Sequence, residues 1–217
     1  GRRGEKKSMQ PFAASSIPLV TLGTFLLWFG WFGFNGFSQL AMGTFDDVNA
    51  ISKIAVNTHL AGAAGTVTGA ALTRLIGGKT DIVMMLNGAL AGLVAITAEP
   101  LTPGPITAMV IGSIGAVIMY YGTKLLENFG LDDVVGAIPV HMFAGIFGTL
   151  VVPITNIDTS FGTQFIGVIS VCIFSFVLSW ITFSTLKSTV GLRISRAAEK
   201  QGTDKAEVGV IAYSIRD

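Results

Sequence analysis

Apolar residues fill six long stretches of this chain, and charged residues stand almost only between them. Each stretch runs for 17 to 38 residues without an Asp, Glu, Lys or Arg. A helix needs about 20 predominantly apolar residues to cross the hydrocarbon core of a bilayer, and these stretches are too long for the strands of a membrane barrel. We therefore predict six transmembrane helices, at residues 18–37, 54–76, 82–98, 104–126, 134–153 and 161–186.

The predicted fold class is thus an all-α membrane protein, and the basic residues predict its orientation. With six spans, both termini and two loops share one side of the membrane, which then holds 13 of the 14 Lys and Arg residues. Only Lys53 falls on the other side. Basic residues accumulate in cytoplasmic loops. We expect a cytoplasmic basic loop at residues 1–17, a six-helix transmembrane domain at 18–186 and a cytoplasmic tail at 187–217.

The composition narrows the function classes. Charged residues make up 12% of the 217 residues, against about 25% in a typical soluble domain. The net charge of +1 gives no electrostatic footprint for nucleic acid, and the single cysteine, Cys172, argues against a disulfide-stapled secreted domain. The sequence shows no metal-ligand spacing, phosphate-binding loop or nucleophile–base pair. We therefore predict no metal, no cofactor, no catalytic residue and no enzymatic activity.

The first residues of the chain suggest that it is part of a longer protein. The chain opens in a basic segment without an initiator Met, which suggests a fragment of a longer protein. The first apolar stretch is too long for a signal peptide and lacks a small-residue cleavage pattern. We expect this stretch to remain in the membrane as a span.

The two histidines lie in different settings. His141 falls near the middle of the predicted span 134–153, and an ionisable group at membrane depth is a functional candidate by default. The alternative is a His that is hydrogen-bonded to a neighbouring helix. His59 lies near the outer start of the span 54–76, where a structural role is the simpler interpretation. Pro139 removes a helical hydrogen bond beside His141 and is compatible with a kink there.

Other residues allow both a structural and a functional interpretation. The segment Phe29–Ser38 is dense in aromatic residues, which is typical of an interfacial belt but also of a cation site, because aromatic faces attract small cations. Asp132 and Asp133 precede a predicted helix, where carboxylates commonly cap the first turn. Repeats such as Gly65-x-x-x-Gly69 and Gly88-x-x-x-Gly92 favour close helix packing in lipid.

Five motifs resemble the ammonium transporter family (Amt/Mep/Rh), and they occur in the family's order along almost the whole chain. They correspond to spans six to eleven of an eleven-span fold, that is, to the second inverted repeat plus the last helix. The motifs are Leu27-Trp28-Phe29-Gly30-Trp31-Phe32-Gly33-Phe34-Asn35-Gly36 with Ser38, Asn57-Thr58 with Leu60-Ala61, Asn87-Gly88 with Leu90-Ala91-Gly92-Leu93-Val94, Asp132-Asp133 with Val140-His141, and Val190-Gly191-Leu192-Arg193.

The resemblance implies a function and a set of site residues. Members of the family conduct ammonium or ammonia across the plasma (inner) membrane as homotrimers with one pore per subunit. Trp31 and Ser38 match the external recruitment site, Phe34 matches one ring of the phenylalanine gate, and His141 matches the second of two pore histidines. The implied mechanism is capture of the cation, deprotonation, and passage of ammonia along a dry, histidine-lined pore.

The chain also departs from the family pattern. Phe37 replaces a small residue, and Gly136 replaces an Asp five residues before the pore His. In the tail, Val208 and Val210 replace His and Glu, so regulation through PII-type signalling proteins is in question. The first five spans and the other pore histidine lie outside this sequence, so we expect half a pore. The alternative function is the ammonium-sensing domain of a larger signalling protein; a membrane enzyme using His141 has little support.

Overall fold

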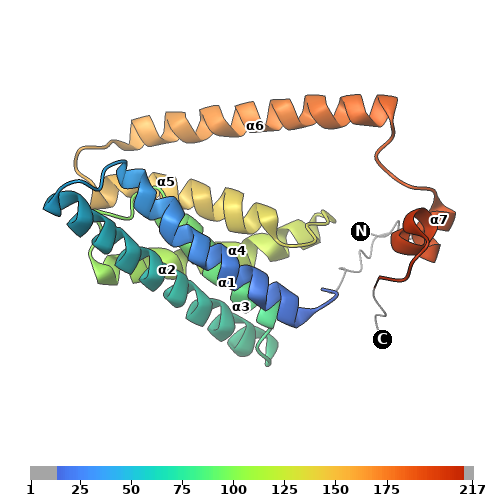
Figure 1. Cartoon of the computed structure of the whole chain (residues 1–217), viewed down its shortest axis with the longest axis horizontal. Coiled ribbons are helices and arrows are strands. Elements are labelled where there is room, and N and C mark those ends of the chain that lie inside the picture. The colour runs from blue at the N-terminus through green and yellow to red at the C-terminus, as the bar shows by residue number, and fades with distance from the viewer. Residues whose placement is uncertain (1–13, 213–217) are drawn as a thin grey trace. The chain divides into compact units, whose positions relative to one another are not determined.

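The computed structural model describes residues 14–212, which form helices joined by loops and contain no strand (Figure 1). This confirms the predicted all-α fold class. Contacts between helices divide the chain into two compact units, Ser16–Phe165 and Ile166–Asp217, the second of which also takes in Gly1–Ser15. The predicted basic loop lies mostly outside the described residues. The predicted domain boundaries at 18 and 186 therefore stay predictions.

The first unit contains most of the predicted spans. Its helices are α1 (Ile17–Gly36), the short η1 (Phe37–Gln39), α2 (Phe45–Gly77), α3 (Ile82–Ile96), α4 (Pro105–Asn128), the short π-helix η2 (Ile138–Phe143) and α5 (Ala144–Thr155). Helix α6 (Phe161–Thr189) begins at the end of this unit, and α7 (Arg196–Gln201) and the π-helix η3 (Asp204–Val208) belong to the second.

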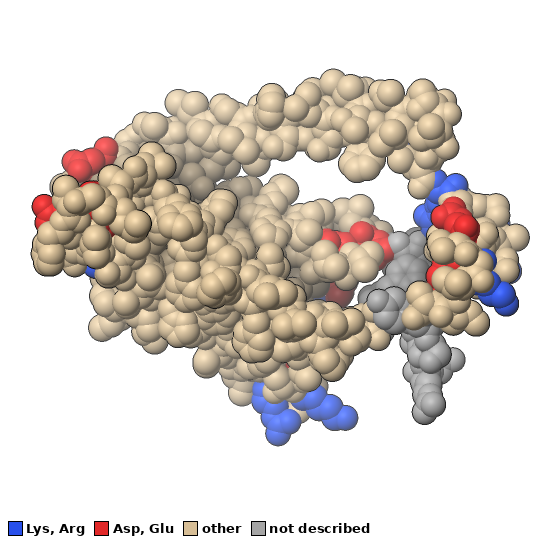
Figure 2. Space-filling model, viewed as in Figure 1, with Lys and Arg blue, Asp and Glu red and all other residues tan. Residues whose placement is uncertain are grey.

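Four of the described segments are long and apolar enough to cross a membrane: Ile17–Gln39, Pro105–Asn128, Ile138–Thr155 and Phe161–Thr189. Helix α3 is apolar but has only 15 residues. Helix α2 has 33 residues, and its polar first turns lie ahead of the predicted span. In Figure 2 the sides of the helices are largely uncharged, and Lys, Arg, Asp and Glu lie mainly near helix ends and in the tail. This distribution is that of helices whose sides face lipid.

Helix α2 begins at Phe45, ahead of the predicted start at residue 54. The physical reason is a capping box: Thr44 Oγ1 accepts from the N–H of Asp47, and the Asp47 carboxylate accepts from the N–H of Thr44. A hydropathy pattern finds the apolar part of a helix, whereas the cap sets where the helix starts. The polar turns from Phe45 to Lys53 therefore extend the helix beyond the apolar stretch.

Helices α2, α3 and α4 pack directly against one another and form the centre of the first unit. Glycines bring their backbones together: a Cβ on Gly88 would lie 2.6 Å from the carbonyl oxygen of Gly65, and a Cβ on Gly115 would lie 2.8 Å from that of Ala91. Side chains cannot fit between backbones at these separations. The packing interpretation of the two glycine repeats is confirmed.

The fifth predicted span starts later than expected, at Ile138 rather than residue 134. Gly136 has a φ of +74°, which breaks the helix on its N-terminal side. Asp133 then accepts from the N–H groups of Ala137 and Ile138, at 2.9 and 2.7 Å. The predicted capping role is confirmed for Asp133. Pro139 lies in the π-helical η2, whose wider turn begins the helix that carries His141.

The second unit contains most of α6, from residue 166, and the tail. No residue of α6 is buried. Ser195 caps α7, and Arg193 forms an ion pair with Glu199 at 2.8 Å. Asp204 accepts from the N–H of Ala212 at 2.9 Å, and this hydrogen bond lowers the pKa of the Asp204 carboxyl below its ordinary value. The tail is thus folded locally through residue 212.

Candidate functional site

Three of the four predicted site residues lie together at the C-terminal end of α1. The rings of Trp31 and Phe34 have centroids 6.1 Å apart and are tilted by 56°. Ser38 Oγ donates to the carbonyl oxygen of Phe34 at 2.9 Å. Phe34 is 65% exposed. The arrangement offers aromatic faces and a hydroxyl oxygen within about two turns of helix.

A residue that the sequence did not suggest completes this group. The indole Nε1–H of Trp31 donates to Thr97 Oγ1 at 2.8 Å, although 66 residues separate the two. Thr97 in turn donates to the carbonyl oxygen of Leu93 at 2.6 Å. No local pattern marks Thr97, because its role depends on the packing of α1 against α3.

Buried amides fix α1 and the neighbouring loop to α2. Asn35 donates to Thr58 Oγ1 at 3.0 Å, and the Asn35 side chain is 1% exposed. Asn57 donates to the carbonyl oxygens of Pro100 and Pro103, at 2.9 and 2.8 Å. These bonds give the Nδ2 group of each side chain a partner in an apolar unit, where an unpaired group is costly. Asn35 Oδ1 is buried without a partner within the described residues. They also hold the α3–α4 loop close to the end of α1.

His141 lies in a different part of the unit. It is on η2, which packs against α3, α4 and α5, whereas α1 packs against α2 and α3. The His141 side chain is exposed, while the preceding Val140 is buried. The structure therefore places Trp31, Phe34 and Ser38 together and places His141 apart from them, with α3 as the element that both groups contact.

His59 forms an aromatic cluster with α1. Its ring is stacked on Phe32 with centroids 6.2 Å apart and an angle of 21°, and it lies 5.5 Å from the centroid of Trp28. Trp28 Nε1 is buried without a hydrogen-bond partner within residues 14–212. These contacts favour the structural role that the sequence suggested for His59, because its partners are packing side chains of the neighbouring helix.

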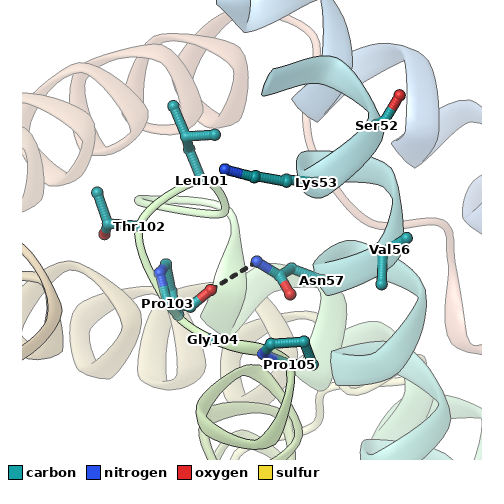
Figure 3. A pocket seen from close by; sticks show the side chains of 9 residues that line it. All are labelled: Ser52, Lys53, Val56, Asn57, Leu101, Thr102, Pro103, Gly104 and Pro105. Carbon is teal, nitrogen blue, oxygen red and sulfur yellow. Dashed lines mark hydrogen bonds between the residues drawn. The ribbon is translucent and has the colours of Figure 1, made fainter. Parts of the chain in front are cut away.

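A cavity of about 460 Å³ lies between α2 and the α3–α4 loop (Figure 3). The residues that line it are Ser52, Lys53, Val56, Asn57, Leu101, Thr102, Pro103, Gly104 and Pro105. Figure 3 shows the Lys53 side chain extending beside Leu101, above the hydrogen-bonded Asn57. A cationic side chain at the edge of the cavity opposes the binding of a second cation. The cavity is therefore a poor candidate for a cation site.

Comparison with known proteins identifies the family. The sequence profile described as Ammonium Transporter Family matches residues 1–213. The chain belongs to the ammonium transporter family. This confirms the family resemblance that the motifs indicated.

Individual relatives agree with this assignment. The chain is 41% identical to the ammonium transporter Amt2 of Archaeoglobus fulgidus, over 91% of the chain and 46% of the relative. Among solved structures, a Sensor Amt Protein is 35% identical with a TM-score of 0.80, over 88% of this chain and 49% of that one. Candida albicans Mep2 is 27% identical with a TM-score of 0.76, over 89% and 46%. The chain spans about half the length of these relatives.

One departure of this family member has a visible structural cause. A Cβ at Gly136 would lie 2.7 Å from Asn87 Nδ2, and the backbone there has a positive φ. Asn87 Nδ2 donates to the carbonyl oxygen of Val135 at 3.1 Å. The side chain of Asn87 thus occupies the space beside residue 136. An Asp at this position, as the family resemblance leads one to expect, would be strained in this backbone.

Proposed function

We propose that this chain supplies one half of a pathway for ammonium or ammonia across the plasma membrane. The observation that carries the proposal is the grouping of Trp31, Phe34 and Ser38 at the end of α1, in a chain of the ammonium transporter family. Aromatic faces attract a small cation by roughly 1–2 kcal/mol once it is desolvated. The first step is therefore capture of the ammonium ion at the outer end of α1.

The hydrogen bond of Ser38 adds a second attraction. Its hydroxyl hydrogen is used in donating to Phe34 O, which leaves the oxygen lone pairs free to accept an N–H of the ammonium ion. Phe34 accepts this bond through its backbone carbonyl and is largely exposed. An ion held here loses part of its water before it passes the phenyl ring. Its proton then goes to the imidazole relay that includes His141, and the solute continues as ammonia.

His141 handles the solute further along the path. A neutral imidazole carries one donor and one acceptor, so it can accept an ammonia N–H or pass a proton. Its side chain is exposed in this chain and is available to line a pore together with a first half of five helices. We also propose that the protein assembles as a homotrimer, that both termini of this chain are cytoplasmic, and that it has no enzymatic activity. The tail has Val208 and Val210 where the family usually has His and Glu, so we expect weaker binding of a PII-type signalling protein there.

The second candidate function is ammonium sensing. It is favoured by the likeness to a solved Sensor Amt Protein, at 35% identity and a TM-score of 0.80. A sensor would use the same aromatic site to bind ammonium and would pass the signal to another domain. Binding of ammonium without flux would favour this function over transport.

Uptake of labelled methylammonium tests the proposal. The chain is expressed in cells without their own ammonium transporters, alone and joined behind the first half of the Archaeoglobus fulgidus relative. Uptake is expected only in the joined protein. His141→Leu in the joined protein is expected to lower uptake or change its coupling to protons. Uptake by the chain alone would contradict the half-pore, and an unchanged His141→Leu variant would remove this residue from the mechanism.

A further inference from the structure

A short stretch of chain, residues 133–140, leads directly into His141, and we call it the lead-in segment. The Asp133 carboxylate accepts from the N–H groups of Ala137 and Ile138, at 2.9 and 2.7 Å. These bonds satisfy N–H groups at the start of η2, which have no partner one turn earlier in the helix. They close the segment on itself but do not attach it to a neighbouring helix. Its placement therefore depends on other contacts.

A hydrogen bond from Asn87 attaches the lead-in segment to α3. Asn87 Nδ2 donates to the carbonyl oxygen of Val135 at 3.1 Å, across 48 positions of the chain. Asn87 lies in the second turn of α3, one of the three helices that form the centre of the first unit. A donor on a rigid element holds its partner more precisely than one on a loose segment. The backbone at Val135 is thus held relative to α3.

Gly136 provides the space that this amide occupies. Gly136 is buried, and a Cβ on it would lie 2.7 Å from Asn87 Nδ2. The positive φ of Gly136 turns the chain at this point, directly after the carbonyl that accepts the bond. The amide of Asn87 and the bare backbone of Gly136 therefore form one contact, in which each depends on the size of the other.

The contacts of the lead-in segment determine which way His141 faces. Pro139 and Val140 are buried, whereas His141 is exposed. On the α4 side, a Cβ at Gly122 would lie 3.4 Å from Pro139 Cβ, so this proline packs against the backbone of α4. Pro139 also has no N–H to donate within its own helix. The turn is therefore held to a larger extent by its neighbours, which cover one face and leave His141 on another.

We propose that Asn87 is a positioning residue for His141, one that holds the lead-in segment on α3 and so fixes the direction of the imidazole. The inference rests on the proposed function, because it concerns how His141 meets the solute on the same path. Asn87 acts through the backbone at Val135 and not by contact with the solute. Without its amide, the lead-in segment is free to turn about its axis, and the ring leaves the position in which it lines the path.

The chain offers a matched control for this role. Asn87→Leu keeps a side chain of similar size and removes the amide that donates to Val135. Asn128, at the end of α4, is exposed, and its side chain makes no hydrogen bond within residues 14–212. Asn128→Leu is thus the same replacement without a bond to lose. A second variant, Asn87→Asp, keeps the shape and places a carboxylate oxygen, which cannot donate, opposite the Val135 carbonyl.

The first arm of the test reads the imidazole directly and needs no transport. The chain contains two His residues, so ¹⁵N labelling of the His rings in the purified chain in detergent gives two sets of signals, and His141→Leu assigns them. Asn87→Leu and Asn87→Asp are expected to shift the His141 signals and to leave those of His59, which lies on α2, in place. Asn128→Leu is expected to shift neither. If both Asn87 variants shift both rings, or neither ring, the positioning role is wrong.

The second arm measures methylammonium uptake by the joined protein described above, corrected for the amount of protein in the membrane. Asn87→Leu is expected to lower the maximal rate about tenfold, or about 1.4 kcal/mol, with little change in the apparent KM, because capture precedes the step at His141. In a His141→Leu background the same change is expected to have no further effect, since Asn87 acts through His141.

The two backgrounds make the outcome decisive. An equal loss of rate with and without His141 would show that Asn87 acts elsewhere and would refute the inference, as would a shifted ring with an unchanged rate. If the joined wild-type protein takes up no methylammonium, the proposed function fails, while the result on the His141 ring stands by itself.

Discussion

Gly112 shows at the scale of one residue how closely the helices approach. An added Cβ there would lie 2.7 Å from Ala61 Cα, and closer still to the Ala61 carbonyl oxygen. The obstacle is backbone, which cannot turn aside as a flexible side chain can. The absence of a side chain at Gly112 is therefore a requirement of the packing of α4 on α2.

We predict that Gly112→Ala destabilises the chain. Overpacking of this kind costs about 1–3 kcal/mol, so the thermal midpoint of the purified chain in detergent, followed by circular dichroism, should fall. Gly23→Ala is the control, since nothing lies within 4 Å of a Cβ at Gly23, and it should leave the midpoint unchanged or raise it slightly. Equal midpoints for the two variants would show that the backbones separate more easily than the structure implies.

The site residues differ in how far the sequence could reveal them. Trp31, Phe34 and Ser38 lie within eight positions, on the end of α1 and the following η1, so a local motif contains all three. Thr97 bonds to Trp31 across 66 positions, and only the packed structure brings these two together. His141 was suggested because an ionisable residue stands out in an apolar stretch, but its separation from Trp31 needs the fold.

At the scale of the element, the start of α2 is a pH-sensitive feature. The Thr44 hydroxyl donates to the Asp47 carboxylate at 2.7 Å, and Gln39 donates to it at 3.2 Å. These bonds, with that from Thr44 as the largest, lower the pKa of the Asp47 carboxyl below its ordinary value. The ionised carboxylate therefore stabilises the first turn of the helix.

The sign of the pH effect follows from the lowered pKa. Because the folded pKa of Asp47 lies below the unfolded one, its contribution is complete above about pH 4 and is lost as the pH falls through the folded pKa. We predict that hydrogen exchange of the first turn of α2 accelerates on acidification below this range. In Thr44→Val the pKa of Asp47, measured by NMR titration, should rise. A titration midpoint of Asp47 that is the same in both proteins would contradict the role of the cap.

The elements also show which boundaries a hydropathy pattern can give. The apolar stretch predicted at 18–37 became α1 (Ile17–Gly36), because Ser16 caps the helix just before the apolar residues begin. The stretches at 54–76 and 134–153 missed the helix starts, because Thr44 extends α2 outward and the positive φ of Gly136 delays η2. Hydropathy shows which stretch of the chain is apolar. The exact start of a helix depends on single residues, such as a capping side chain or a residue with a positive φ, which hydropathy does not show.

At the scale of the whole molecule, the basic residues predict the side on which each loop lies. We expect Thr102, in the α3–α4 loop, to face outward and Thr80, in the α2–α3 loop, to face the cytoplasm. In a Cys172→Ser background, Thr102→Cys should react with a membrane-impermeant maleimide on intact cells. Thr80→Cys should react only after the cells are opened. The reverse pattern would place both termini outside and contradict the predicted orientation.

The glycine contacts among α2, α3 and α4 have a mechanical consequence. Backbones that touch directly leave no layer of side chains to yield, so the three helices cannot slide or tilt against one another without a clash. They are the stiff frame of the first unit, and any opening or closing of a path must be taken up outside them. The parts outside this frame include the exposed Phe34 at the end of α1 and the π-turn that carries His141.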